Sequence, residues 1–391
     1  MRKVLVVLTL LVFSVSPLMA ANNVTVKQLD EFLAEQHSAS KSDDAVATRL
    51  KDMVLTEQLT TATMNSFTRY EPGPLTVTQI RILAVTSALL PPPPADLPTT
   101  AAPDAAAQAA IMAKAVDYAS KVYAHLPKMS ANKTTVRYQN GVNYIATDSG
   151  TGSNMAGGNL TVRPEDQYIR MLGQNTTEVR SEGGIEVPPA KVKQADPASQ
   201  NGQVSQGGAG LVLGMVLMDA AKGKLNWLRW QTVEGKQVAV FAFDVPKKQS
   251  QYKINYCCFP ERSNVGSAVP MGGSGLAGSS ATGGISATHG TSVTWHDYKA
   301  APGYKGEIFI DPETGTILRL ITQAELKPTD LVHEEDIRVD YGQVEIGGKP
   351  YTVPVKSFVL TEVVPNGDSF VKFSTRRTLF EVEYSNYALQ N

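Results

Sequence analysis

The segment KGEIFIDPETGTILRLITQAEL (Lys305–Leu326) decides the fold of this chain. Two runs rich in apolar and β-branched residues, Lys305–Ile310 and Ile317–Leu326, flank the turn sequence Asp311-Pro-Glu-Thr-Gly315. Pro at the second turn position and Gly at its close suit a type I turn with a bulge, which joins two antiparallel strands. The segment therefore predicts a β-hairpin rather than a strand–helix–strand unit.

Further turn signals on both sides of this segment predict an antiparallel meander. Asn140-Gly141 lies between two alternating runs, which is a strong hairpin signal, and Gly347-Gly348 and Asn366-Gly367 punctuate later strands. One segment, residues 209–221, is apolar over most of a helical circumference and is therefore predicted to be a buried helix. Over residues 127–391 we expect a curved, mostly antiparallel sheet, an open barrel, packed over that helix.

The part of the chain before the meander is predicted to be helical, so the fold class is α+β. Apolar residues recur there with a period close to 3.6, and Thr25 with Gln28 forms a capping box at the first helix. A second helix, capped by Ser42 or Asp43, carries the stripe Val46, Leu50, Met53 and Val54. We predict a helical region at 22–126 that contains a stiff Pro-rich connector at 91–103.

Residues 1–21 have the pattern of a secretory signal peptide. Arg2 and Lys3 precede an apolar run, Val4–Val15, and the small residues Ala20 and Ala21 follow. The run is shorter than the roughly 20 residues that a membrane-spanning helix needs. We expect cleavage near Ala20/Ala21, a periplasmic or extracellular protein, and no integral membrane segment in the mature chain.

Charge and motifs argue against several function classes. The 36 basic and 37 acidic residues give a net charge of −1, which disfavours a nucleic-acid partner. The string Gly273–Gly278 matches the letters of a dinucleotide-binding turn. It lies, however, within a Gly/Ser-rich insertion, 263–290, without a helix after it. We expect no cofactor.

One cluster near this insertion could bind a transition metal. Its residues lie at or near the two ends of the insertion, so a hairpin-like excursion would bring them together; they are His289, His296, Asp297 and Cys258. Imidazole, thiolate and carboxylate are suitable ligands, although the spacing alone does not specify a site.

A second candidate is an apolar pocket beneath the curved sheet. Aromatic residues are concentrated on the strands that flank the apolar helix: Trp227, Phe241, Phe243, Tyr252, Tyr256 and Trp295. These rings either form ordinary core or line a concave surface for a lipid-like ligand.

Two resemblances accompany these patterns. The chain is similar to a family of uncharacterised secreted bacterial proteins over four stretches: Val26–Leu59, Lys224–Ser250, Glu307–Leu326 and Asp340–Ser357. Residues 131–391 more distantly resemble the periplasmic lipoprotein-carrier and sigma-factor-regulator superfamily, through the strand order and the Phe309–Gly315 hairpin followed by Ile317–Leu320. That resemblance implies an open antiparallel barrel with an apolar cavity for acyl chains, but it implies no particular binding residue.

Three functions are therefore compatible with the sequence. The leading hypothesis is an exported, non-enzymatic envelope protein that binds a lipid-like ligand or another envelope protein. The first alternative is a secreted metal-dependent enzyme that uses the site near His289 and His296. The second is an assembly or scaffold protein that acts through its helical region.

Overall fold

The computed structural model describes ten parts of the chain: residues 22–121, 125–140, 168–187, 202–203, 213–217, 219, 224–233, 235–261, 294–364 and 375–390. For residues 202–203, 257, 258, 260, 261 and 294–296 the description covers the backbone only. The predicted signal peptide, the Gly/Ser-rich insertion and the Asn366-Gly367 turn lie outside the described residues. The chain divides into two compact units, one up to Ser87 and the other Ala88–Asn391.

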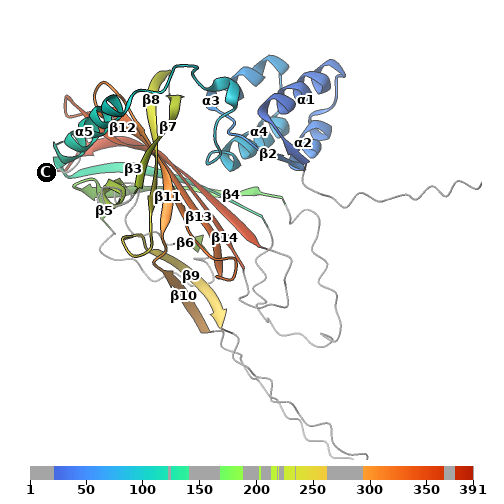
Figure 1. Cartoon of the computed structure of the whole chain (residues 1–391). Helices are drawn as coiled ribbons and strands as arrows, with labels where there is room; N and C mark the ends of the chain where they lie inside the picture. The colour runs from blue at the N-terminus through green and yellow to red at the C-terminus, as the bar shows by residue number, and fades with distance from the viewer. Residues whose placement is uncertain are drawn as a thin grey trace, which may run out of the picture. The chain divides into compact units, whose positions relative to one another are not determined.

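The first unit is built from short helices (Figure 1). Its helices are α1 (Val26–Ser38), α2 (Asp43–Lys51), α3 (Thr61–Ser66), η1 (Phe67–Tyr70) and α4 (Pro74–Thr86), and a two-stranded parallel sheet joins β1 (Asn22–Val24) to β2 (Met53–Leu55). The Thr25–Gln28 capping box is present as predicted. Ser42 caps α2, but Met53 and Val54 form β2 rather than a continuation of that helix.

The cap of α4 comes from a distant residue. The two carboxylate oxygens of Asp43 accept hydrogen bonds from the backbone N–H groups of Leu75 (2.9 Å) and Thr76 (2.8 Å). A carboxylate at this position satisfies two donors of the first helical turn and complements the helix dipole. This bond fixes α4 against α2 above a core that includes Leu29, Leu50 and Phe67.

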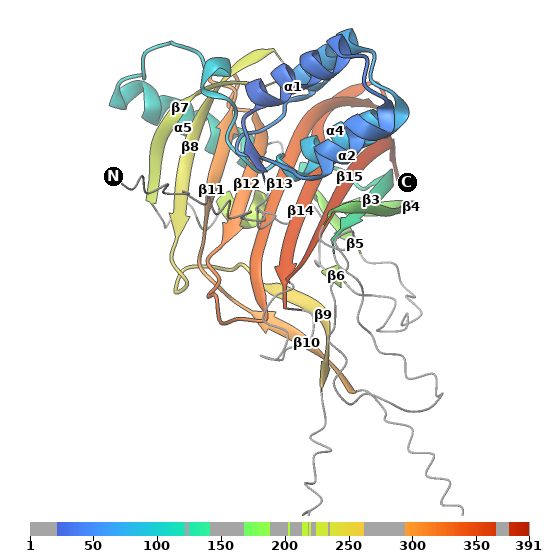
Figure 2. The same cartoon turned by 90° about the vertical axis from the view of Figure 1, so that its right-hand side faces the viewer.

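The second unit is organised around one ten-stranded sheet, in which every neighbouring pair of strands is antiparallel. Its spatial order is β5-β4-β3-β15-β14-β13-β12-β11-β8-β7, and Figure 2 shows the strands side by side from β7 to β4. The bounds are β3 Met129–Gln139, β4 Arg170–Glu182, β5 Ile185–Val187, β7 Lys224–Val233, β8 Lys236–Val245, β11 Tyr304–Ile310, β12 Ile317–Ala324, β13 Val332–Ile346, β14 Lys349–Val363 and β15 Arg376–Leu389. A second sheet has the order β10-β9-β6, from Thr294–Ala300, Ile254–Glu261 and Gly202–Gln203.

Two of the predicted hairpins are confirmed. Asp311–Gly315 closes the β11–β12 hairpin, with Gly315 at φ +76°, and Gly347-Gly348 closes the β13–β14 hairpin. The hairpin that we predict at Asn140-Gly141 lies outside the described residues from Gly141 onward. Along the described part, β3 pairs with β15 on one edge and with β4 on the other, as far as Gln139.

The core lies on one face of the ten-stranded sheet, which we call the core face. Alternation along β13 places Ile337, Val339 and Tyr341 on this face, and Asp336, Arg338 and Asp340 on the opposite face. The predicted helix is present where its residues are described, at 213–217 and 219, and Leu213 and Val216 are buried in this core. Helix α5 (Ala105–Lys121) adds Ile111 and Ala115 to the same core.

The Pro-rich stretch is docked on the sheet rather than free. We call residues 88–103 the strap. On the opposite face, Leu89 packs against a cluster that contains Val240 and Phe309. Further along, the carbonyl of Ala101 accepts a hydrogen bond from the indole of Trp230 (2.9 Å). The strap thus leads from the opposite face to α5 on the core face, and α5 belongs to the second unit rather than to the N-terminal helical region where we expected it.

Candidate functional site

The predicted aromatic set packs mainly as core. Phe241, Phe243, Tyr252 and Tyr256 are each at most 4% exposed. The ring of Trp227 lies 5.4 Å from that of Phe241, and the ring of Tyr304 lies 5.8 Å from that of Phe243 and 5.2 Å from that of Tyr252. Rings in such mutual contact fill space instead of lining an open wall. The side chain of Trp295 lies outside the description.

The acid–base groups among these rings are hydrogen-bonded to one another. The hydroxyl of Tyr304 donates to Asp219 (3.1 Å), and the hydroxyl of Tyr252 donates to Glu335 (3.3 Å). Burial, reinforced by the adjacent carboxylate, raises the pKa of both phenols above the ordinary value. Asp219 also accepts from the backbone and side chain of Gln251, so it anchors the end of the buried helix to the body of the fold.

The predicted metal ligands are brought together only in part. β9 and β10 pair antiparallel, as the hairpin-like excursion required, and the backbone of His296 lies opposite Phe259, the residue after Cys258. Asp297 is exposed and forms an ion pair with Lys299 (3.6 Å). His289 and the side chains of His296 and Cys258 lie outside the description. No group of three metal-ligating side chains occurs among the described residues.

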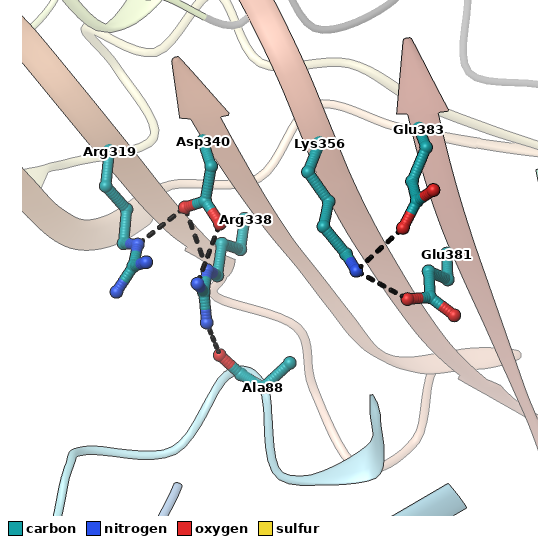
Figure 3. Close-up of polar contacts among 7 residues, drawn as sticks. All are labelled: Ala88, Arg319, Arg338, Asp340, Lys356, Glu381 and Glu383. Atoms are coloured by element: carbon teal, nitrogen blue, oxygen red, sulfur yellow. Dashed lines mark hydrogen bonds and ion pairs between the residues drawn. The ribbon is translucent and has the colours of Figure 1, made fainter. Parts of the chain in front are cut away.

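A buried charge cluster occupies the opposite face of the sheet (Figure 3). Asp340 on β13 accepts from Nε of Arg319 on β12 (2.5 Å) and from Nε and Nη2 of Arg338 (3.0 and 2.7 Å). Burial alone would raise the pKa of Asp340, but the two guanidinium groups outweigh it and lower the pKa well below the ordinary value. Arg338 also donates to the carbonyl of Ala88 (2.7 Å) at the start of the strap.

The neighbouring part of this cluster is likewise paired. The ammonium of Lys356 on β14 lies between two carboxylates of β15, 2.6 Å from Glu381 and 3.1 Å from Glu383. Because Asp340 and Lys356 already have oppositely charged partners, this cluster has the character of a structural network that fixes neighbouring strands and the strap. It offers no obvious general base.

An apolar cleft lies at the other end of the core, where β3, β4 and β5 meet β14 and β15. It is shallow: about 30 Å³ of it is enclosed, and the empty space amounts to about 420 Å³ only when the part open to solvent is counted. Its floor is buried side chains: Leu126, Met129, Ala131 and Val353. The rest of its lining is Val179, Ser181, Gly184, Glu186, Pro354, Tyr384 and Tyr387. We call this the apolar cleft.

The polar groups of the apolar cleft are held in place by local bonds. The hydroxyl of Tyr387 donates to the carbonyl of Pro354 (2.6 Å), which fixes that ring. Glu186 is the one charged residue in the lining, and both of its oxygens accept from Lys133 (3.0 Å). An apolar floor with a neutralised acid suits binding of an apolar group better than proton transfer.

Little in the sequence indicated this cleft. Met129 and Ala131 alternate on β3 in the way a strand requires, but they follow a helical segment and precede the stronger alternation at Val136 and Tyr138. Tyr384 lies on the last strand, 255 residues after Met129, and Tyr387 follows it; only the pairing of β15 with β3 brings them to the same place.

No membrane-crossing helix is found in the described parts: none of their helices is both long and apolar enough to span a bilayer. Comparison with family models, with curated proteins and with solved structures yields no match for this chain.

Proposed function

We propose that this chain is an exported, non-enzymatic binding protein that holds an aliphatic ligand, such as a fatty acyl chain, in the apolar cleft. The observation that carries the proposal is the lining of the cleft: buried aliphatic side chains form the floor, and the one charged residue is neutralised by Lys133. In this view the curved sheet works as an open barrel whose ligand enters near β3–β5. The aromatic rings beneath the buried helix then support the fold rather than contact the ligand.

The walls of the cleft fit this class of ligand. The enclosed part of the cleft is small, about 30 Å³, so most of a bound alkyl chain would lie along its open apolar surface. Tyr384 and Tyr387 supply flat, rigid walls at its mouth, and such rings bury a large area for little conformational entropy. We therefore expect binding of a single alkyl chain rather than of a two-chain lipid.

Titration of the delipidated protein with dodecanoate and with a hydrophobic fluorescent dye tests the proposal. We expect saturable binding at one site. Ser181→Phe would fill the cleft from its half-buried rim and weaken binding about tenfold or more, by displacing an alkyl group from its apolar contacts. Thr177→Phe adds the same ring at an exposed position of the same strand and should leave binding unchanged.

Two results would contradict the proposal. One is the lack of saturable binding up to high micromolar ligand. The other is equal binding by the wild-type protein and the Ser181→Phe variant, which would place the ligand elsewhere.

A further inference from the structure

The outer edge of β4 is only partly occupied. Along its inner edge β4 pairs with β3 from Arg170 to Ser181. On the other edge β5 pairs with Arg180–Glu182 alone. Over Arg170–Val179 this edge therefore has no partner strand within the parts of the chain that are described. A strand edge of this kind presents a row of N–H and C=O groups that can bind another strand.

Among the described residues, this edge lacks most of the features that keep strand edges from pairing. Proteins usually protect an edge with charges, proline, a cover or a very short strand. Between Arg170 and Glu178, however, seven consecutive residues carry neither charge nor proline, and all of Arg170–Glu178 is exposed. Met171 and Leu172 are 47% and 44% exposed. The edge is thus long, accessible and mildly apolar.

The same edge is complementary to itself. In its pairing with β3, Leu172 is skipped at a bulge, so that Met171 lies opposite Tyr138 and Gly173 opposite Arg137. A second β4 can be placed antiparallel on the outer edge, with a twofold axis between Gln174 and Asn175 and the same residue skipped. Arg170 of each copy then lies opposite Glu178 of the other.

The length of the unpaired edge supports this register, and so do the charges at its two ends. The free stretch ends at Val179, where β5 begins to occupy the edge, and the antiparallel register pairs Arg170 through Glu178 without reaching β5. Opposite charges facing each other across two strands stabilise the pair, and a twofold axis makes every such contact twice.

We propose that the chain forms a twofold dimer in which the β4 strands of two copies pair along Arg170–Glu178 and join the two ten-stranded sheets. The partner is a second copy of this chain, because the edge matches itself in length and in charge. This surface differs from the apolar cleft, which opens on the core face and does not require the second copy.

Sedimentation equilibrium of the full exported chain tests the proposal. We expect a monomer–dimer equilibrium. Arg170→Glu or Glu178→Arg alone places like charges opposite each other twice in the dimer and should weaken association about tenfold or more. The double variant, Arg170→Glu with Glu178→Arg, restores opposite charges and should recover the wild-type association constant. Lys224→Glu, on the edge strand β7 at the other end of the sheet, is the matched control and should have no effect.

Hydrogen exchange supplies a second measurement that does not depend on variants. Backbone amides between Met171 and Thr177 that point outward should exchange fast in dilute solution and become protected as the concentration rises. A chain that is monomeric at every concentration, a dimer insensitive to both charge reversals, or outward amides already protected in the dilute monomer would each overturn the proposal.

Discussion

At the scale of single residues, Asp336 places an ionisable carboxyl group in a buried position, which disfavours its charged form. Burial, slightly offset by a hydrogen bond from Gln323, raises its pKa to about 6. A raised carboxyl pKa means that the folded state binds the proton more tightly than the unfolded chain. The resulting stabilisation is full below about pH 4 and is lost as the pH rises through about 6.

Asp336→Asn should therefore stabilise the protein at pH 8 and change little at pH 4. The asparagine oxygen still accepts the bond from Gln323, but no buried charge forms at high pH. We expect the free energy of unfolding in urea to rise by on the order of 2 kcal/mol at pH 8. An equal change at both pH values would contradict this explanation.

Asp340 presents the reverse case. Its charge is stabilised by Arg319 and Arg338, so its low pKa contributes stability above the ordinary pKa of an aspartate, which is lost in strong acid. Asp340→Asn leaves two buried guanidinium groups without their counter-ion and should cost about 3 kcal/mol at pH 7 in urea unfolding. Lys128→Met, which removes an exposed ion pair with Glu182, is the control and should cost less than about 0.5 kcal/mol. Equal costs would mean that the cluster has no special role.

These residue-level features were only partly predictable. The sequence identified Thr25, Ser42 and Gly315 because capping and turn chemistry are local. The roles of Asp340 and Arg338 could not be predicted from the sequence. They depend on pairing with β12 and on the strap, which lies some 250 residues earlier in the chain.

At the scale of elements, the β11–β12 turn also supports α5. Gly315 has a positive φ of +76°, and an added Cβ there would lie 2.4 Å from the carbonyl oxygen of Lys114 in α5. Lys114 in turn donates to the carbonyls of Pro312 and Glu313, so helix and turn are joined from both sides.

Gly315→Ala should therefore lower the free energy of unfolding by more than the strain of a left-handed backbone conformation alone would. Gly348 is the matched control, since its φ is +77° and an added Cβ would meet no heavy atom within 4 Å. We expect Gly348→Ala to cost about 1 kcal/mol from backbone strain and Gly315→Ala at least about 1 kcal/mol more from the clash with α5. Urea unfolding measures both, and equal costs would show that α5 does not press on the turn.

Turns were easier to predict than strand partners, for a physical reason. Asp311–Gly315 and Gly347-Gly348 encode their own backbone angles, so both hairpins were recognised. Asn140-Gly141 carries an equally strong local signal, but that turn lies outside the described residues from Gly141 onward, and no turn sequence indicated that β3 pairs with β15 and β4. Met53–Leu55 fitted a helical stripe and forms β2, because pairing with β1 outweighs weak helical periodicity.

At the scale of the whole molecule, the α+β class followed from the change of hydrophobic period along the chain. The large antiparallel sheet follows from the repeated hairpin turns. The cleft was not predictable, because its walls come from β3, β4, β5, β14 and β15, whose neighbours are set by long-range pairing. The aromatic residues instead predicted a pocket at the other end of the core, where their rings fill the interior.

Export also belongs to this scale. We expect the secreted protein to lack the first 20 or 21 residues when its intact mass is measured. Leu10→Arg places a charge in the middle of the predicted apolar run and should hold the precursor inside the cell. Normal secretion of that variant, or a secreted protein of full mass, would contradict the signal-peptide prediction.

The central claim is that an alkyl chain binds in the apolar cleft, and a crystal structure with bromine-labelled dodecanoate tests it most directly. The anomalous signal of bromine locates the end of the chain without any interpretation of weak ligand density. We predict one bromine peak at the floor of the apolar cleft, within van der Waals contact of Met129 or Val353. A peak among Phe243, Tyr252 and Tyr304, or no peak at saturating ligand, would contradict the claim.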